Sequence, residues 1–299
     1  MSKSKRALLL LPAILASCAT APPAPLPSDV IVCGAEEVFV LSIRRKGEKV
    51  WSWTAAEHPE IPEPLRKKFG STDDCKPVDG GRKVLITSSG GAVALVERPS
   101  GRVVFYAAAV NAHSAELLPN HRLIVASSTG RDGDRLILFD LAQSDKPLAS
   151  DELTGAHGLV WDPERELLWA LGTNELRAYE VQADRTTGAL VLSRRMTHTL
   201  PNDGGHDLRP LPGSPLLNLT THHHVWQFDR DLLTFRTHPD FGSMENVKCV
   251  DVNPASGGTL LIQAEISWWS EHLRFPGTDR VLEFKGRKLY KARWCPSLE

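Results

Sequence analysis

After about residue 29, the hydrophobic residues fall in short runs that show almost no helical periodicity. Runs such as VIVCG (30–34), KVLITSS (83–89) and RLIVASS (122–128) are rich in β-branched residues and leucine. They are separated by Gly, Pro, Asn and Asp, which is typical of strands joined by tight turns. Only residues 62–69, PEPLRKKF, suggest a helical turn. The pattern therefore predicts an all-β fold.

Three stretches of the chain repeat a common arrangement. They read AHSAELLPNHRLIVASS, AHGLVWDPERELLWALG and GHDLRPLPGSPLLNLTT, and each places a histidine (His113, His157 or His206) before a strand, a turn with proline and a second strand. Two weaker copies put Asp74, and either Glu245 or Asn246, in the histidine position. A spacing of roughly 40–50 residues is that of four-stranded propeller blades.

With the strands at residues 30–54 as a further blade, the repeats predict a β-propeller of six blades with four antiparallel strands each. A seven-bladed or open arrangement is the alternative, because the first blade shows only three strands and the ring closure stays open. A two-sheet sandwich would not predict the recurring histidine.

The innermost strand of each blade lines the central channel, and the loop before that strand opens on one face. We therefore expect His113, His157 and His206 to surround the channel mouth, together with Asp74 and Asn246. The loops between second and third strands open on the same face. These loops bring His222 and His223 of the run THHH (221–224) over the same pocket.

Three converging imidazoles predict a site for a divalent metal ion such as zinc or manganese, completed by a carboxylate or water. Two other interpretations remain open. The histidines could line a metal-free polar pocket with hydrogen-bonding or acid–base roles, or they could be purely structural.

Four groups of residues are further candidates. Glu116, on a channel-lining strand, and Glu265, at a strand end, could orient a histidine or carry a proton. Trp268 and Trp269 suit stacking on a sugar ring, and Arg274 suits a carboxylate. Each has a structural alternative: an ion pair between blades for Glu116, a solvated loop acid for Glu265, and packing between blades for at least one tryptophan.

The N-terminus predicts export. Residues 1–17 have a basic start and an apolar run that is too short to span a membrane. The tetrad Leu15-Ala16-Ser17-Cys18 resembles the bacterial lipobox, which implies cleavage before Cys18 and acylation of that cysteine. Residues 18–28 then form a Pro/Ala-rich tether, and residues 29–299 form the propeller domain. This predicts an extracytoplasmic, membrane-anchored protein, with the outer membrane favoured.

The compartment permits disulfides, so Cys33, Cys75, Cys249 and Cys295 could pair in three ways or remain free thiols. Lys and Arg total 35 against 36 Asp and Glu, which disfavours a nucleic-acid partner. Signatures of serine hydrolases, nucleotide-binding loops and zinc ribbons are absent from the sequence. The oligomeric state does not follow from it.

The stretches HSAELLPN, GGHDLRPLPG, THHHVWQFD and QAEISWWSEHLRF, taken together, resemble an uncharacterised family of bacterial secreted six-bladed propeller lipoproteins. That resemblance covers nearly all of residues 29–294 and implies no particular activity. More distantly, a histidine-lined mouth is similar to oligogalacturonate lyases, whose metal and His or Arg groups would imply proton removal beside a uronate carboxylate. This second resemblance is architectural only.

Two functional hypotheses follow, and the sequence leaves open whether the protein is an enzyme. The first is a metal-dependent, lyase-like carbohydrate enzyme in which His222 or His223 transfers a proton. The second is a non-catalytic lipoprotein that binds a small molecule, a glycan or a protein on the same face. A structural scaffold is a third possibility.

Overall fold

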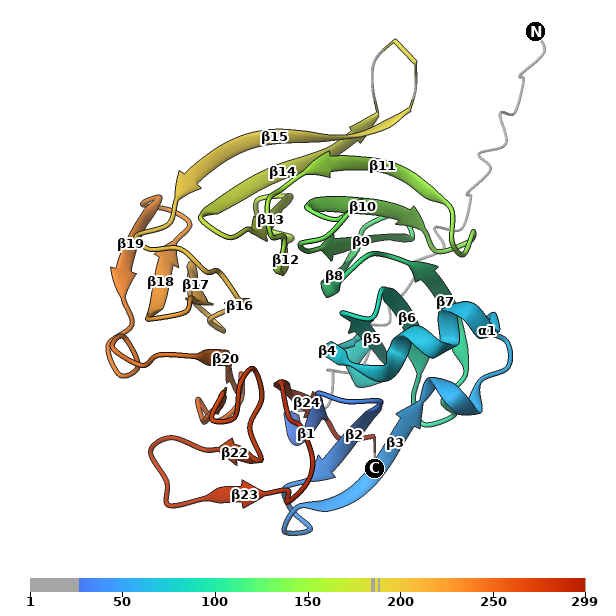
Figure 1. Ribbon diagram of the computed structural model, residues 1–299. Helices are drawn as coiled ribbons and strands as arrows, with labels where there is room; N and C mark the ends of the chain where they lie inside the picture. Colours follow the sequence, from blue (N-terminus) through green and yellow to red (C-terminus); the bar gives the residue numbers. More distant parts are fainter. Residues whose placement is uncertain (1–26, 184–185, 188, 299) are drawn as a thin grey trace, which may run out of the picture.

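The chain forms six four-stranded antiparallel sheets arranged around a central channel (Figure 1). The structure is a computed structural model that describes residues 27–183, 186, 187 and 189–298. The fold is a six-bladed β-propeller, so the predicted class, blade count and four-stranded blades are confirmed.

The strands of each blade follow one another outwards from the channel. The first blade contains β24 (Lys291–Pro296), β1 (Pro27–Cys33), β2 (Glu37–Ser42) and β3 (Glu48–Thr54). The second contains β4 (Thr72–Val78), β5 (Lys83–Ser88), β6 (Ala92–Glu97) and β7 (Val103–Ala108). The third contains β8 (Ala112–Leu118), β9 (Arg122–Ser127), β10 (Arg135–Asp140) and β11 (Pro147–Glu152).

The remaining three blades repeat this order. The fourth contains β12 (Gly158–Asp162), β13 (Leu167–Leu171), β14 (Glu175–Ala183) and β15 (Leu190–Thr199). The fifth contains β16 (Asp207–Pro210), β17 (Leu216–Thr220), β18 (Val225–Asp229) and β19 (Thr234–Thr237). The sixth contains β20 (Val247–Val252), β21 (Thr259–Gln263), β22 (His272–Arg274) and β23 (Val281–Glu283).

Short helices connect the first two blades. They are η1 (Ala55–Glu57), α1 (Glu63–Arg66) and η2 (Lys67–Gly70), and the last two cover the predicted helical turn. A further turn, η3 (Asp79–Gly81), joins β4 to β5. None of the helices in the described part of the chain is long and apolar enough to cross a membrane.

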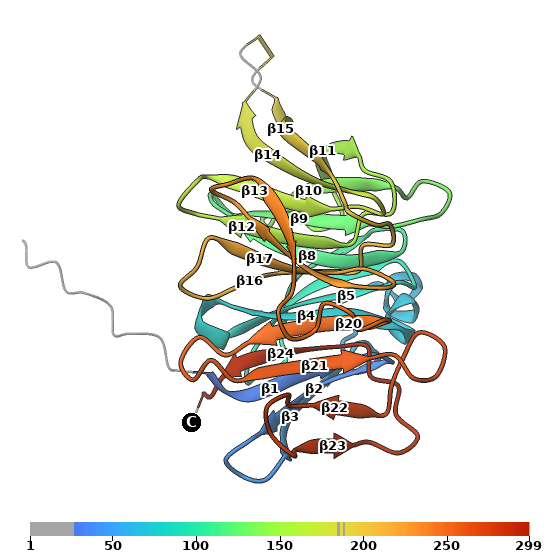
Figure 2. The ribbon, with the colours of Figure 1, turned by 90° about the vertical axis from the view of Figure 1, so that its left-hand side faces the viewer.

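The ring closes through the C-terminal strand, a point that the sequence left open. β24 pairs antiparallel with β1 from Pro27↔Pro296 to Cys33↔Lys291, so the two ends of the chain share one blade (Figures 1 and 2). β24 is thereby the innermost strand of the first blade and supplies its fourth strand. β1 begins at Pro27, inside the segment predicted as tether.

The hydrophobic core consists of layers between neighbouring blades. In β9, Leu123 and Val125 pack towards the second blade, while Ile124 and Ala126 pack towards the fourth. This alternation is what buried strands require, since successive side chains point to opposite faces. Central strands such as β9 therefore read as nearly continuous apolar runs.

All four cysteines of the described residues are free and fully buried: Cys33, Cys75, Cys249 and Cys295. Burial raises the pKa of Cys249 to about 12 and that of Cys295 to about 11, which disfavours the reactive thiolate. The sequence had left disulfides and free thiols open, and the structure has free thiols.

We expect these four thiols to be unreactive in the folded protein. A chromogenic disulfide reagent at pH 8 should modify almost none of them within an hour, and all four within minutes once guanidinium unfolds the chain. Recovery of only two or none in non-reducing guanidinium would show that disulfides are present, contrary to the structure.

Candidate functional site

One residue from each blade occupies an equivalent position where the inner strand begins. These six positions are equivalent because the residue two positions later in each inner strand is buried against the preceding blade. These buried residues are Ala292, Cys75, Ala115, Leu159, Leu208 and Val250. Counting back two gives the six residues that we call the mouth ring: Tyr290, Asp73, His113, His157, His206 and Lys248.

Three of these positions are β-bulges. The pairing of the first and second strands skips Asp73 in β4, His113 in β8 and Lys248 in β20. A bulge leaves its residue unpaired and re-aims its side chain. The extra residue therefore lets these blades present a polar group at the mouth without changing which residues of the rest of the inner strand face the neighbouring blades.

The three histidines lie side by side. The ring centroids of His113 and His157 are 4.1 Å apart, and those of His157 and His206 are 5.4 Å apart. From the fifth-blade loop, His222 joins them, with its Nδ1 3.0 Å from Nε2 of His206. The structure thus brings together the three histidines that were predicted to converge.

Local backbone groups hold two of the imidazoles. Nδ1 of His113 lies 2.9 Å from the carbonyl oxygen of Asn111, and Nδ1 of His157 lies 2.8 Å from that of Gly155. Because a carbonyl can only accept, this hydrogen bonding assigns the proton to Nδ1 in both neutral rings and leaves Nε2 as the free nitrogen.

Lys248 is the cation of the mouth ring. Its Nζ lies 3.1 Å from Nε2 of His206, and the residue is only 5% exposed. Among the described residues, no carboxylate lies within ion-pair distance of this ammonium. Burial and the nearby Lys291 lower the pKa of Lys248 to about 8. The mouth ring therefore holds a largely desolvated positive charge whose hydrogen-bond partner is a neutral imidazole.

Asp73 and Tyr290 complete the ring. Oδ1 of Asp73 is 3.6 Å from Nε2 of His113, which is too long for a hydrogen bond. Burial raises the pKa of Asp73 against the opposing effect of His113. The Tyr290 ring centroid lies 6.3 Å from that of His113, so the closing strand contributes to the site.

A buried charge network fills the channel beneath the mouth ring. Arg293, which is fully buried, donates hydrogen bonds to Asp74 (2.9 Å) in the second blade and to Asp207 (2.7 and 2.8 Å) in the fifth. Lys291 Nζ is 3.4 Å from Asp207 Oδ1 and donates to the His206 carbonyl at 3.2 Å. The closing strand is thus anchored by ion pairs that cross the channel.

The network continues deeper in the channel. Lys76 pairs with Glu116 at 3.1 Å and donates to the carbonyl of Leu159 at 2.6 Å, while Arg209 pairs with Asp251 at 2.8 Å. Burial alone would raise the pKa values of Asp74 and Asp207, but the surrounding cations, Arg293 foremost, lower both below the usual value. Both aspartates are therefore charged and paired.

Several predicted site residues lie elsewhere than expected. Asp74 is not at the mouth, since it is 1% exposed and bonded to Arg293 and Ser114. The mouth position belongs to its neighbour Asp73, one residue earlier. Asn246 is exposed in a turn, where its N–H donates to the carbonyl of His222, and the mouth position belongs to Lys248.

The two candidate proton carriers among the glutamates are both committed to ion pairs. Glu116 lies in the deep network with Lys76. Glu265 accepts hydrogen bonds from Ser270, His272 and Arg274, and these outweigh burial to lower its pKa to about 2. This Glu265 cluster also occupies Arg274, the predicted carboxylate-binding residue. Glu265 is therefore a poor general base at neutral pH.

The remaining candidates lie in two loops on the mouth face. His223 is exposed and lies 3.7 Å from Glu245, whereas His222 contacts His206 of the mouth ring. Trp268 is 37% exposed and Trp269 is partly buried. The predicted acylation site, Cys18, and the signal peptide lie outside the described residues.

The histidines fit a metal ion poorly. Within residues 27–183, 186, 187 and 189–298, no group of three or more His, Cys, Asp or Glu side chains is arranged so that it could hold one. The Lys248 ammonium and His222 both face Nε2 of His206, the nitrogen that a third imidazole ligand would use. A cation already occupies the place that a metal would need.

Burial lowers the pKa values of His157 and His206 well below 6.5. At His157 the neighbouring imidazoles add to this effect, and at His206 Lys248 and His222 do so. Both rings are neutral in the folded protein but take up protons near pH 6.5 when unfolded. The free energy of unfolding therefore includes their full contribution above about pH 6.5 and falls as the pH drops below that value.

We expect the free energy of unfolding to fall by about 3–4 kcal/mol more between pH 7 and 5 in the parent than in a His157→Gln, His206→Gln variant, because each buried neutral histidine contributes about 2 kcal/mol over this range. Urea titrations at both pH values measure this difference. The exposed His223→Gln is the matched control and should keep the parental pH dependence. An equal pH dependence in parent and double variant would contradict the neutral buried histidines.

Fold and site define the protein as a six-bladed β-propeller whose channel mouth carries a ring of imidazoles, a buried ammonium, a carboxyl group and a tyrosine. A sequence model of a family of unknown function, DUF6528, matches residues 16–297, and the chain belongs to this family. None of the curated proteins matches the sequence.

Proposed function

We propose that the mouth ring binds a small anionic ligand, namely the carboxylate of an acidic sugar, and that the protein is a binding protein of the cell envelope. The observation that carries this proposal is the buried Lys248 ammonium beside three imidazoles, without a carboxylate partner among the described residues. An unpaired buried charge is costly, and an anion at the mouth would offset that cost.

The surrounding groups support an anion of modest size. Nδ1 of His206 is buried and has no hydrogen-bond partner within the part of the chain that the structure covers, so it can donate to an oxygen. The imidazoles of His113 and His157 offer free Nε2 atoms, which accept from sugar hydroxyls. Together these groups supply donors for a carboxylate and acceptors for hydroxyls.

The metal-dependent lyase receives less support from this geometry. Binding a divalent ion to the three histidines would bring it against the Lys248 ammonium. Of the four candidate proton carriers, Glu116 and Glu265 are held in ion pairs, which leaves His222 and His223. Non-catalytic binding needs neither a metal nor a free base. The lipobox-like Cys18 supports anchoring of such a binding protein to the envelope, with the outer membrane favoured.

Calorimetric titration of the chelator-treated protein with galacturonate, and with galactose as the uncharged control, tests the proposal. We expect galacturonate to bind and galactose to bind at least tenfold more weakly, without any effect of added zinc or manganese. Binding that requires an added metal ion, or product formation on prolonged incubation, would instead favour the lyase.

A further inference from the structure

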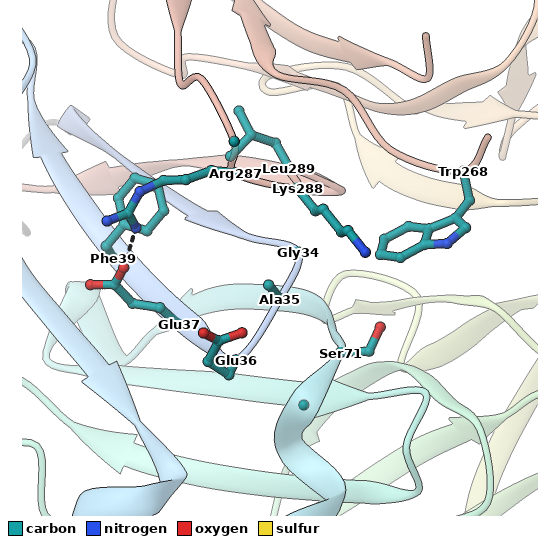
Figure 3. Close-up of a pocket in the computed structure, with 12 residues that line it drawn as sticks. Gly34, Ala35, Glu36, Glu37, Phe39, Ser71, Trp268, Arg287, Lys288 and Leu289 are labelled. Atoms are coloured by element: carbon teal, nitrogen blue, oxygen red, sulfur yellow. Dashed lines mark hydrogen bonds and ion pairs between the residues drawn. The ribbon is translucent and has the colours of Figure 1, made fainter. Parts of the chain in front are cut away.

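A cleft of about 550 Å³ opens beside the mouth, between the first, second and sixth blades (Figure 3). Its walls are residues 34–37, 39, 70–71, 268 and 286–289. Residues 34–36 join second and third strands, whereas residues 70–71 and 286–289 lead into inner strands. These connections open on the mouth face, so the cleft and the mouth ring share one surface.

Trp268 and Lys288 form the functional wall of this cleft. Nζ of Lys288 lies 5.9 Å from the Trp268 ring centroid and 5.8 Å from that of Trp269. In the part of the chain that the structure describes, Lys288 has no ion pair with a carboxylate. Figure 3 shows the lysine extending towards the Trp268 ring, with Ser71 and Glu36 on the opposite wall. The ammonium therefore lies over two aromatic rings and has no carboxylate partner among the described residues.

Of the other charged groups in the cleft, Arg287 and Glu37 are already paired, whereas Glu36 has no ion pair among the described residues. Arg287 forms an ion pair with Glu37, and its guanidinium lies 5.6 Å from the Phe39 ring centroid. Lys49 also pairs with Glu37, at 2.7 Å. This leaves Lys288 as the wall residue placed to meet an anionic group. The exposed Glu36 and the half-buried Ser71 are placed to meet hydroxyls.

The cleft is linked to the mouth ring through Tyr290. The ring centroid of Tyr290 is 5.8 Å from that of Trp268 and 6.3 Å from that of His113. Tyr290 is itself 4% exposed, so it forms a packed floor between the two sites. A ligand that extends from the mouth over Tyr290 reaches the Trp268 face directly.

We propose that the cleft is a second subsite of the same ligand, which is therefore an acidic oligosaccharide of at least two sugar rings. One acidic ring lies at the mouth ring, and a neighbouring ring stacks on Trp268 with its carboxylate near Lys288. Sugar rings stack on exposed tryptophan through their apolar faces, and an unpaired lysine favours a charged sugar over a neutral one. This inference rests on the proposed function of the mouth.

Titration with galacturonate and with its dimer and trimer tests the inference. In the parent, the trimer should bind about tenfold more tightly than the monomer and should change the tryptophan fluorescence, whereas the monomer should not. Trp268→Ala should reduce trimer affinity to that of the monomer and leave monomer affinity unchanged. Trp268→Phe should restore part of the difference.

A matched pair of lysine variants tests the cation. Lys288→Met should weaken trimer binding about tenfold, and Lys285→Met, an exposed neighbour near Glu283, should not change it. Equal affinity of the parent for monomer and trimer would overturn the inference while leaving the mouth site intact. Failure of every galacturonate to bind would overturn the proposed function, and the inference with it.

Discussion

Replacing Arg293 with methionine is expected to lower the free energy of unfolding by about 3–5 kcal/mol, because it leaves buried aspartates without their main counter-ion. Arg293 bonds to Asp74 and Asp207, and all three are almost completely buried. Methionine is similar in length but cannot donate, so Asp74 and Asp207 would keep only the weaker influence of nearby cations such as Lys291, Lys76 and Arg209. The closing strand would also lose its hydrogen bonds from Arg293 to the second and fifth blades and keep those of Lys291 to the fifth.

Urea unfolding measured by circular dichroism gives this value. Arg102→Met is the control, since Arg102 forms an exposed ion pair with Glu97 and its loss should change stability by less than about 1 kcal/mol. Adding Asp74→Asn and Asp207→Asn to Arg293→Met should recover part of the loss, because neutral amides need no counter-ion. A loss below about 1 kcal/mol for Arg293→Met would show that the network does not anchor the ring closure.

Replacing Lys248 with methionine should weaken ligand binding without lowering the free energy of unfolding. We expect galacturonate affinity to fall about 10–100-fold, since the variant removes a charge-assisted hydrogen bond worth about 1.5–3 kcal/mol. Stability should stay the same or rise, because the change removes a buried ammonium that no carboxylate of the described residues balances. A buried lysine whose removal harms binding but not folding is retained for a ligand.

The pH dependence of binding provides a second readout. Because the pKa of Lys248 is about 8 in the free protein, affinity for galacturonate should fall as the pH rises through 8 and the ammonium loses its charge. Lys248→Met should abolish this fall, and the exposed control Lys146→Met should retain it. A Lys248→Met variant that unfolds readily yet binds normally would mark the lysine as structural.

The architecture was predictable because a propeller repeats its constraints. Each blade needs the same apolar alternation and the same turn before its second strand, so His113, His157 and His206 recur at matching points. The ring closure was harder, since pairing of β24 with β1 joins segments from opposite ends of the chain. Nothing local in residues 291–296 distinguishes an inner strand from an outer one.

The other half of the mouth ring was missed because of register. In the second and sixth blades the histidine is replaced, and the alignment placed Asp74 and Asn246 where Asp73 and Lys248 lie. The usable signal was the buried residue two positions later, Cys75 in one case and Val250 in the other. Tyr290 was missed for a different reason, because its blade depends on the closure.

Roles of exposed residues depend on contacts that sequence spacing does not determine. Glu265 forms ion pairs with Arg274 and His272, which lie close to it in the sequence. Two of the predicted site residues, Glu265 and Arg274, are therefore paired with each other. Trp268 was identified from its unusual sequence, but its partner Lys288 comes from the segment before β24. Only the fold shows that these two side chains meet.

The most direct test of the anion site is the pKa of Lys248 itself, measured by nuclear magnetic resonance of isotope-labelled lysine side chains and assigned with Lys248→Met. We expect a pKa near 8 in the free protein and a clear rise when galacturonate saturates the site, because a bound carboxylate stabilises the ammonium. A Lys248 pKa that is unchanged at saturation would place the ligand elsewhere and contradict the proposed role of the mouth ring.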